Sequence, residues 1–175
     1  GDANDSSGNG NHGTENGEVA YTTGVSGQAA SFDGVDDFVN LGNLPNDSVA
    51  SYSVWFKTNQ DKRNQAIIGD YVYSSYIDGS ALILMGSEAP SERLWFYTEN
   101  DSKGSGGRSD AVSNGNYHDG EWYHAIGVID ETEVRFYING VLVATEVRSY
   151  ASSNNDFYVG YADTDPSGSF TDTFF

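Results

Sequence analysis

The stretch VRFYINGVLV, residues 134–143, decides the fold class more clearly than any other part of the chain. It places Asn139-Gly140 between two runs of β-branched and aromatic residues. Both central positions of a type I′ turn need positive φ, which Asn and Gly tolerate, and this turn joins the two strands of a tight hairpin. The stretch therefore predicts a β-hairpin with strands over 134–138 and 141–147.

Short strand-like segments continue from this hairpin in both directions. They are rich in β-branched and aromatic residues, and Gly, Asn and Asp separate them. No window of helical length shows a 3.6-residue apolar period with caps. Strands at this spacing without helices between them indicate an antiparallel sandwich or barrel. The further strands expected are 18–21, 28–32, 38–41, 52–57, 66–68, 71–76, 81–85, 94–97, 122–129 and 157–159.

Two polar segments stand apart from this pattern within the single domain expected over residues 1–175. Residues 1–17 have no apolar periodicity, and such a stretch is disordered unless something such as a metal ion ties it down. Residues 99–120 are too polar and too long for a hairpin turn. We expect them to form a surface loop that carries function.

Acidic residues dominate the charge, with 26 Asp and Glu against 8 Lys and Arg and a net charge of −18. This charge would repel a nucleic acid or an anionic membrane surface, so both partners are disfavoured. No apolar run approaches the roughly 20 residues that a membrane helix needs, so no membrane insertion is expected. The carboxylates either hold divalent cations such as calcium or keep the protein soluble in salty surroundings, and both explanations are compatible.

Six motifs follow one another in a distinctive order: DSSGNGNHG (5–13), GQAASFDGVDDFV (27–39), YSVWFK (52–57), WYH (122–124), VRFYINGVLV (134–143) and FYVG (157–160). Together they resemble laminin-G-like domains of the concanavalin A-like lectin/glucanase class, over nearly the whole chain. The resemblance implies an all-β fold, an antiparallel β-sandwich jelly roll of two curved sheets. It also implies the binding of glycans or proteins, often with calcium.

The chain departs from this resemblance at its end. Such domains usually continue after the Phe174-Phe175 region with one more strand, which is not in this sequence. A missing strand would expose an unpaired edge and part of the core. Three explanations stay open: the strand is left out, it is lost by cleavage, or another chain donates it. At the other end, Gly1 without Met or an apolar signal segment suggests a processed chain, an excised domain or a partial sequence.

Two groups of acidic and amide residues are candidate calcium sites, because calcium prefers six to eight oxygen ligands. The first comprises Asp5, Asn9, Asn11, Asp33, Asp36 and Asp37. Asx-turns that satisfy local backbone N–H groups explain this group equally well. The second comprises Asp78, Asp163 and Asp165, and the resemblance places such acids at the rim of the sandwich. The alternative there is two solvated acidic turns.

Aromatic residues near strand and loop ends suit a sugar ring, whose apolar C–H face lies on an aromatic ring while its hydroxyls bond polar oxygens. The alternative is that alternate aromatics fill the core between the sheets. Residues expected to bind a ligand are Tyr73, Tyr76, Asp78, Trp95, Tyr97, Tyr117 and Tyr161.

A catalytic role is not expected. Related glucanases carry a strand motif with carboxylates on both sides of the scissile bond, and the nearest match, residues 128–133, lacks the leading acid and falls at a predicted turn. The sequence therefore predicts a non-catalytic, extracellular or cell-surface module that binds a glycan or polysaccharide with the help of Ca²⁺. The alternative is an adhesive or structural module, or a fibre subunit, that binds other protein subunits, including by strand complementation.

Overall fold

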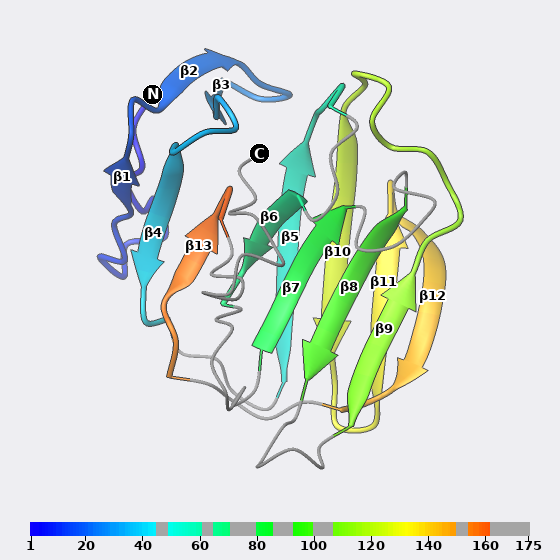
Figure 1. Ribbon diagram of the computed structural model, residues 1–175. Helices are drawn as coiled ribbons and strands as arrows, with labels where there is room; N and C mark the ends of the chain where they lie inside the picture. Colours follow the sequence, from blue (N-terminus) through cyan, green and yellow to red (C-terminus); the bar gives the residue numbers. More distant parts are fainter. Residues whose placement is uncertain are drawn as a thin grey trace.

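The computed structural model describes residues 1–44, 49–60, 65–70, 80–85, 93–99, 107–149 and 154–161. These residues form thirteen β-strands and no helix (Figure 1). Accordingly, the described residues contain no helix that could cross a membrane. The strands are β1 (Thr14–Asn16), β2 (Ala20–Thr23), β3 (Gln28–Ser31), β4 (Phe38–Gly42), β5 (Ala50–Phe56), β6 (Gln65–Gly69), β7 (Ser80–Met85), β8 (Leu94–Glu99), β9 (Arg108–Val112), β10 (Tyr123–Ile129), β11 (Glu133–Ile138), β12 (Val141–Val147) and β13 (Phe157–Val159).

The strands form two layers and a separate hairpin. Seven strands make the front layer of Figure 1, in the order β1-β4-β13-β6-β7-β8-β9. Four strands make the layer behind it, in the order β12-β11-β10-β5. β2 and β3 pair only with each other among the described residues. Every pairing is antiparallel, which confirms the fold class expected from the sequence.

The hairpin of β11 and β12 has the turn that the sequence predicts. Asn139 and Gly140 have φ angles of 50° and 78°, so both central residues lie in the left-handed region. The Asn139 side chain also accepts a hydrogen bond of 2.9 Å from the His124 N–H. This bond fastens the turn to β10, the strand that precedes the hairpin in the chain.

The core lies between the two layers. Phe96 of the larger sheet packs on Phe136 of the smaller one, with ring centroids 6.0 Å apart. Alternate residues of each strand point inward, as the two-residue period of a strand requires. Gly127 faces the same ring so closely that a Cβ atom there would lie 2.5 Å from Phe96. Other buried core residues are Phe56, Ile67, Ile83, Leu94, Ala111, Ala125, Ile129, Val134 and Ile138.

Side-chain hydroxyls join the two layers along one side, where β9 and β12 meet. The Ser109 hydroxyl donates to the Val147 carbonyl at 2.5 Å, and the Ser149 N–H donates to the Ser109 hydroxyl at 2.9 Å. The Thr98 hydroxyl donates to the Ser149 carbonyl at 2.8 Å. Ser109 and Thr98 are buried, so these bonds lie away from solvent and hold the two layers together there.

Two expectations from the sequence need correction. Residues 99–120 are not one surface loop, because Arg108–Val112 form β9 and pair with β8. The hydropathy pattern does not reveal β9 as a strand, because the residues at its inward positions, Ser109 and Ala111, are small. The polar segment 1–17 likewise contains β1, which joins the sheet through backbone pairing with β4. The strand expected over 71–76 lies outside the described residues and stays a prediction.

Candidate metal and ligand sites

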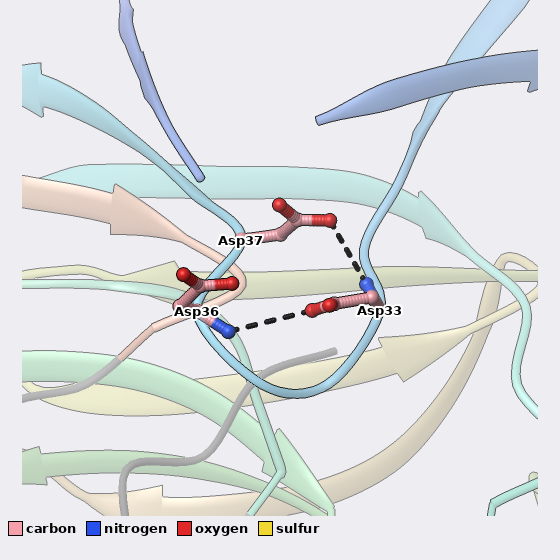
Figure 2. Close-up of side chains that lie close together, drawn as sticks. All are labelled: Asp33, Asp36 and Asp37. Carbon is pink, nitrogen blue, oxygen red and sulfur yellow. Dashed lines mark hydrogen bonds between the residues drawn. The ribbon is translucent and has the colours of Figure 1, made fainter. Parts of the chain in front are cut away.

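Three carboxylates meet in the loop between β3 and β4 (Figure 2). One oxygen from each of Asp33, Asp36 and Asp37 lies within 4.8 Å of the others. Asp37 is buried, and its two oxygens accept hydrogen bonds from the N–H groups of Glu18 at 2.6 Å and Asp33 at 3.1 Å. We call these three residues the acidic cluster.

The chain builds the acidic cluster from a local turn and one distant contact. The Asp33 carboxylate accepts from the N–H groups of Val35 at 2.8 Å and Asp36 at 3.4 Å, the Asx-turn expected for such a sequence. The distant contact needs glycine at position 17, where φ is 76° and a Cβ would lie 2.4 Å from the Asp37 carboxylate. Gly17 thus lets the chain approach Asp37 closely enough for the neighbouring Glu18 N–H to bond it.

The donor chemistry of the acidic cluster fits a hard divalent cation. Three carboxylates carry three negative charges at close range, and no described Lys or Arg forms an ion pair with them. Each carboxylate oxygen has two lone pairs, so the bonds to backbone N–H groups leave further lone pairs available. Calcium takes six to eight oxygens from carboxylates, backbone carbonyls and water. Asp33, Asp36 and Asp37 are therefore the residues that would hold it.

Asp5 does not join this group. Asp5 accepts hydrogen bonds from the N–H groups of Ser7 at 2.7 Å and Asn11 at 2.9 Å, so it closes a turn of its own. The hydrogen bonds from Ser7, followed by that from Asn11, lower the pKa of Asp5 from 3.8 to about 2. In the amino-terminal group predicted from the sequence, the structure therefore brings Asp33, Asp36 and Asp37 together, whereas Asp5 follows the Asx-turn explanation and the Asn9 N–H donates to the Ser7 hydroxyl at 3.3 Å.

The second predicted calcium group, Asp78, Asp163 and Asp165, lies outside the described residues, as do Tyr73 and Tyr76. Their predicted roles stay predictions.

Trp95 and Tyr97 lie on the outer face of the seven-stranded sheet, opposite to the core. They pack with Ala66 and Val112, and their exposed fractions are only 8% and 9%. The Tyr97 hydroxyl bonds the Glu99 carboxylate, whereas the Trp95 indole N–H is buried and has no hydrogen-bond partner among the described residues. Trp95 thus leaves one buried donor unsatisfied on the face where a ligand was expected.

Tyr161 belongs to an aromatic group on the same outer face. Its ring stacks on Phe38 with a centroid distance of 4.9 Å, and it meets Tyr158 edge-on at 5.1 Å. Beside these rings, the Asn40 amide donates to the Asp156 carboxylate at 3.1 Å. All three rings are partly exposed. We call Phe38, Tyr158 and Tyr161 the outer aromatic cluster.

Tyr117, the remaining predicted ligand residue among those described, lies elsewhere. It meets Tyr123 edge-on at a centroid distance of 5.0 Å and packs at the margin of the core. The sequence left open that some of these aromatic residues fill the core. The contacts of Tyr117 fit this alternative, because its side chain packs against the core.

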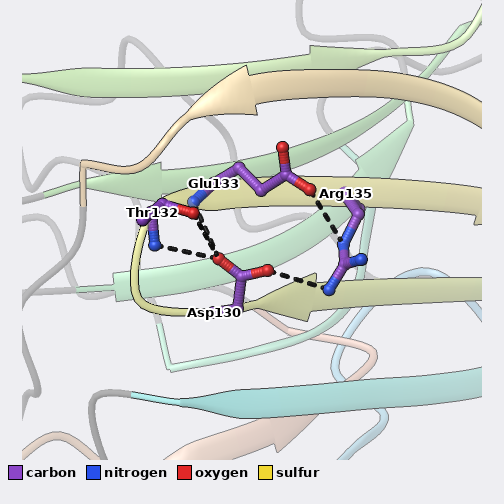
Figure 3. A network of polar contacts seen from close by, with 4 residues as sticks. All are labelled: Asp130, Thr132, Glu133 and Arg135. Atoms are coloured by element: carbon purple, nitrogen blue, oxygen red, sulfur yellow. Dashed lines mark hydrogen bonds and ion pairs between the residues drawn. The ribbon is translucent and has the colours of Figure 1, made fainter.

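Residues 128–133, the nearest match to a glucanase motif, cover the end of β10, the start of β11 and the tight turn between them (Figure 3). Asp130 accepts from the N–H groups of Thr132 and Glu133, both at 2.9 Å, and pairs with Arg135 at 2.9 Å. The bonds from Thr132 and Glu133 lower the pKa of the Asp130 carboxyl. Arg135 also lies 3.4 Å from Glu133. These acids are engaged in closing the turn.

A cavity of about 570 Å³ lies between β3 and β5, where the sequence analysis placed no site. Trp55, Trp122 and Phe32 are among its lining residues. No local pattern signals it, because its described lining residues meet there only in the folded chain; they are residues 22, 24–26, 28–32, 54–60, 65, 67, 122 and 159.

Comparison with solved structures gives the same fold. The chain is similar to domain 4 of AbnA, a GH43 extracellular arabinanase from Geobacillus stearothermophilus, in complex with arabinotriose, with a TM-score of 0.74 and 23% identity over 94% of this chain and 81% of that one. It is also similar to the CBM40 of the Ruminococcus gnavus IT-sialidase, with a TM-score of 0.51 and 10% identity over 66% of this chain and 65% of that one. Domains LG4-5 of the mouse laminin α1 chain give a TM-score of 0.50 and 13% identity over 93% of this chain and 39% of that one.

No curated protein matches the sequence. A laminin G family model, described as the concanavalin A-like lectin/glucanases superfamily, matches residues 32–174, most of the chain, and the chain therefore belongs to this superfamily.

Proposed function

We propose that the protein is a non-catalytic carbohydrate-binding module that acts outside the cell and holds a structural calcium ion. The observation that carries the proposal is the outer aromatic cluster, which sets partly exposed rings beside the polar pair of Asn40 and Asp156. Aromatic rings take the apolar face of a sugar, and amide and carboxylate groups bond its hydroxyls.

Trp95 supports a ligand on the same face of the sheet. A buried indole N–H without an acceptor costs free energy, about 1–3 kcal/mol for a typical unsatisfied group. A sugar hydroxyl reaching Trp95 would satisfy this donor. Tyr73, Tyr76 and Asp78 are proposed to add further contacts, as the sequence predicts.

Calcium is proposed to act through structure rather than by touching the sugar. The acidic cluster lies in the loop that leads into β4, and β4 carries Phe38 and Asn40. An ion bound by Asp33, Asp36 and Asp37 would fix the start of β4 and hence the position of these two side chains. A second ion at Asp78, Asp163 and Asp165 remains part of the proposal.

Two of the structurally similar domains support the proposal that the chain binds a carbohydrate. The arabinanase domain has been seen with arabinotriose, and the sialidase domain is named as a carbohydrate-binding module. The arabinanase is also named as extracellular, which is the location we propose for this chain.

A glycan array probed with and without calcium tests the proposal, followed by titration of the best-binding oligosaccharide. Tyr161→Ala should weaken that oligosaccharide about tenfold, because an aromatic contact contributes about 1.4 kcal/mol. Tyr137→Ala is the matched control, since Tyr137 lies on the outer face of the opposite sheet and should leave affinity unchanged. Absence of binding to any glycan under both conditions would contradict the proposal.

A further inference from the structure

Asp156 is a negatively charged group at the edge of the outer aromatic cluster. Its Oδ2 atom accepts a hydrogen bond of 3.1 Å from the Asn40 amide, whereas Oδ1 accepts none from the described residues. The side chain is half-buried, and no described Lys or Arg forms an ion pair with it. The charge of this carboxylate is therefore not balanced by any described base.

Asn40 holds this carboxylate beside the rings. Its Oδ1 atom accepts from the Gly42 N–H at 2.7 Å while its amide nitrogen donates to Asp156, so both ends of the amide are engaged and its orientation is fixed. Asn40 is also the register partner of Tyr158, and it follows Phe38 by two residues on the same face of β4. A sugar that lies on these rings therefore comes close to the Asp156 charge.

Asp156 and Asn40 together offer an acceptor and a donor at fixed positions. The carboxylate can only accept, and the second N–H of the Asn40 amide nitrogen can only donate. Two neighbouring sugar hydroxyls fit this pair, since one can donate to Asp156 while the other accepts from Asn40. A hydrogen bond to an ionised acceptor is about twice as strong as a neutral one, so a hydroxyl at Asp156 contributes more than an ordinary polar contact.

A carboxylate or sulfate on the glycan would be unfavourable at the same place. It has no proton to donate to Asp156, and two like charges at a partly buried surface repel each other more than they do in bulk water. The rest of the sheet does not offset this repulsion. Its seven strands contain three acidic residues, Glu15, Glu99 and Asp110, and one basic residue, Arg108, which lies opposite Glu99 in the register.

We propose that this site selects uncharged glycans and rejects those that carry a carboxylate or a sulfate, with Asp156 as the residue that sets the selectivity. The inference rests on the proposed function, because it names the class of glycan that the outer aromatic cluster takes. The rings can bind the apolar face of a neutral or an acidic sugar alike. The discrimination therefore comes from Asp156, which Asn40 holds in place.

The test starts from the oligosaccharide that binds best on the glycan array and compares it with its own acidic form, in which the primary alcohols have been oxidised to carboxylates. The protein should bind the acidic form about tenfold more weakly, or worse. Raising the salt concentration from about 0.1 M to about 1 M shortens the screening length from about 10 Å to about 3 Å. Salt should therefore strengthen binding of the acidic form severalfold and leave the neutral form within about twofold.

Asp156→Asn separates charge from shape, because asparagine keeps the size of the side chain and an oxygen that accepts from Asn40. In this variant the ratio of the two affinities should fall about tenfold toward unity. Glu121→Gln is the matched control, since it removes the same unit of charge from an exposed acid in the loop that leads into β10 of the opposite sheet. The ratio in this control should stay within about twofold of the wild-type ratio.

Three results would overturn the selectivity while the glycan function stands. They are a best binder that itself carries a carboxylate or sulfate, equal affinities for the neutral and acidic forms, and a ratio that Asp156→Asn leaves unchanged. A ratio that Glu121→Gln lowers as much as Asp156→Asn would assign the discrimination to the net charge of −18 and would overturn the role of Asp156. Absence of binding to any glycan, neutral or acidic, would contradict the proposed function itself.

Discussion

Trp55 and His124 stack face to face on neighbouring strands, with ring centroids 4.7 Å apart and ring planes 5° from parallel. The Ser53 hydroxyl lies 2.8 Å from His124 Nε2, so the imidazole is held by a ring and by a hydrogen bond. Trp55 is nevertheless 48% exposed. The stack therefore fixes the orientation of a large indole that remains open to solvent beside the cavity.

A double-mutant cycle measures this stack. Trp55→Ala, His124→Ala and the double variant should give a coupling energy of about 0.5–1.5 kcal/mol in urea unfolding, because stacked aromatic pairs contribute that much beyond their buried area. Trp55→Ala with Tyr137→Ala serves as the control cycle and should show additive effects. A coupling energy near zero would mean that the two rings merely lie side by side.

Gly127→Ala should destabilise the protein by about 1–3 kcal/mol, because the added Cβ would lie 2.5 Å from the Phe96 ring in a packed core. Phe96→Leu in the same background should restore part of this loss, since it removes the ring that the methyl group meets. Chemical unfolding of the two single variants and the double variant measures both effects. Additive losses would show that the contact across the two sheets is not the cause.

Calcium should raise the unfolding temperature of the protein relative to a chelator. A bound ion stabilises by RT ln(1 + [L]/Kd), about 2.7 kcal/mol at a hundredfold excess over Kd. Asp36→Asn should abolish the shift yet leave the unfolding temperature in chelator unchanged, because the Asp36 carboxylate accepts no hydrogen bond from the described residues. Glu121→Gln is a control at an exposed acid outside the acidic cluster and should keep the full shift.

Acid should open the turn at Asp5 only at low pH. The pKa of Asp5 is lowered from 3.8 to about 2 in the folded chain, so its stabilising contribution is fully present above the ordinary value. The contribution is lost as the pH falls through about 2. An NMR titration of the Asp5 carboxyl, with amide exchange at Ser7 and Asn11, measures this directly. Titration at the ordinary value would contradict hydrogen bonding in the turn.

Local chemistry was predictable from the sequence wherever a short segment determines its own structure. Asn139-Gly140 needs only two residues with positive φ to make the hairpin, and Asp33 makes its turn with the two N–H groups that follow within three residues. The separation of Asp5 from the acidic cluster was not predictable, because Asx-turns and metal sites use the same residue types. Only the folded chain shows which carboxylates converge.

Features that depend on distant segments were missed. β9 joins its sheet through small inward residues, so hydropathy gives no sign of a strand there. The burial of Trp95 and Tyr97 depends on Ala66 and Val112, which come from two other strands. The cavity depends on how the β2–β3 hairpin lies relative to β5, and no single sequence motif determines that arrangement.

The hydroxyl bonds of Ser109, Ser149 and Thr98 join the two layers along the flank formed by β9 and β12, whereas among the described residues β3 and β5 do not pair with each other at the other flank. The two layers are therefore most firmly joined at the flank formed by β9 and β12. Thermal fluctuations should part the two layers first at the β3–β5 margin, and the flank formed by β9 and β12 should separate last.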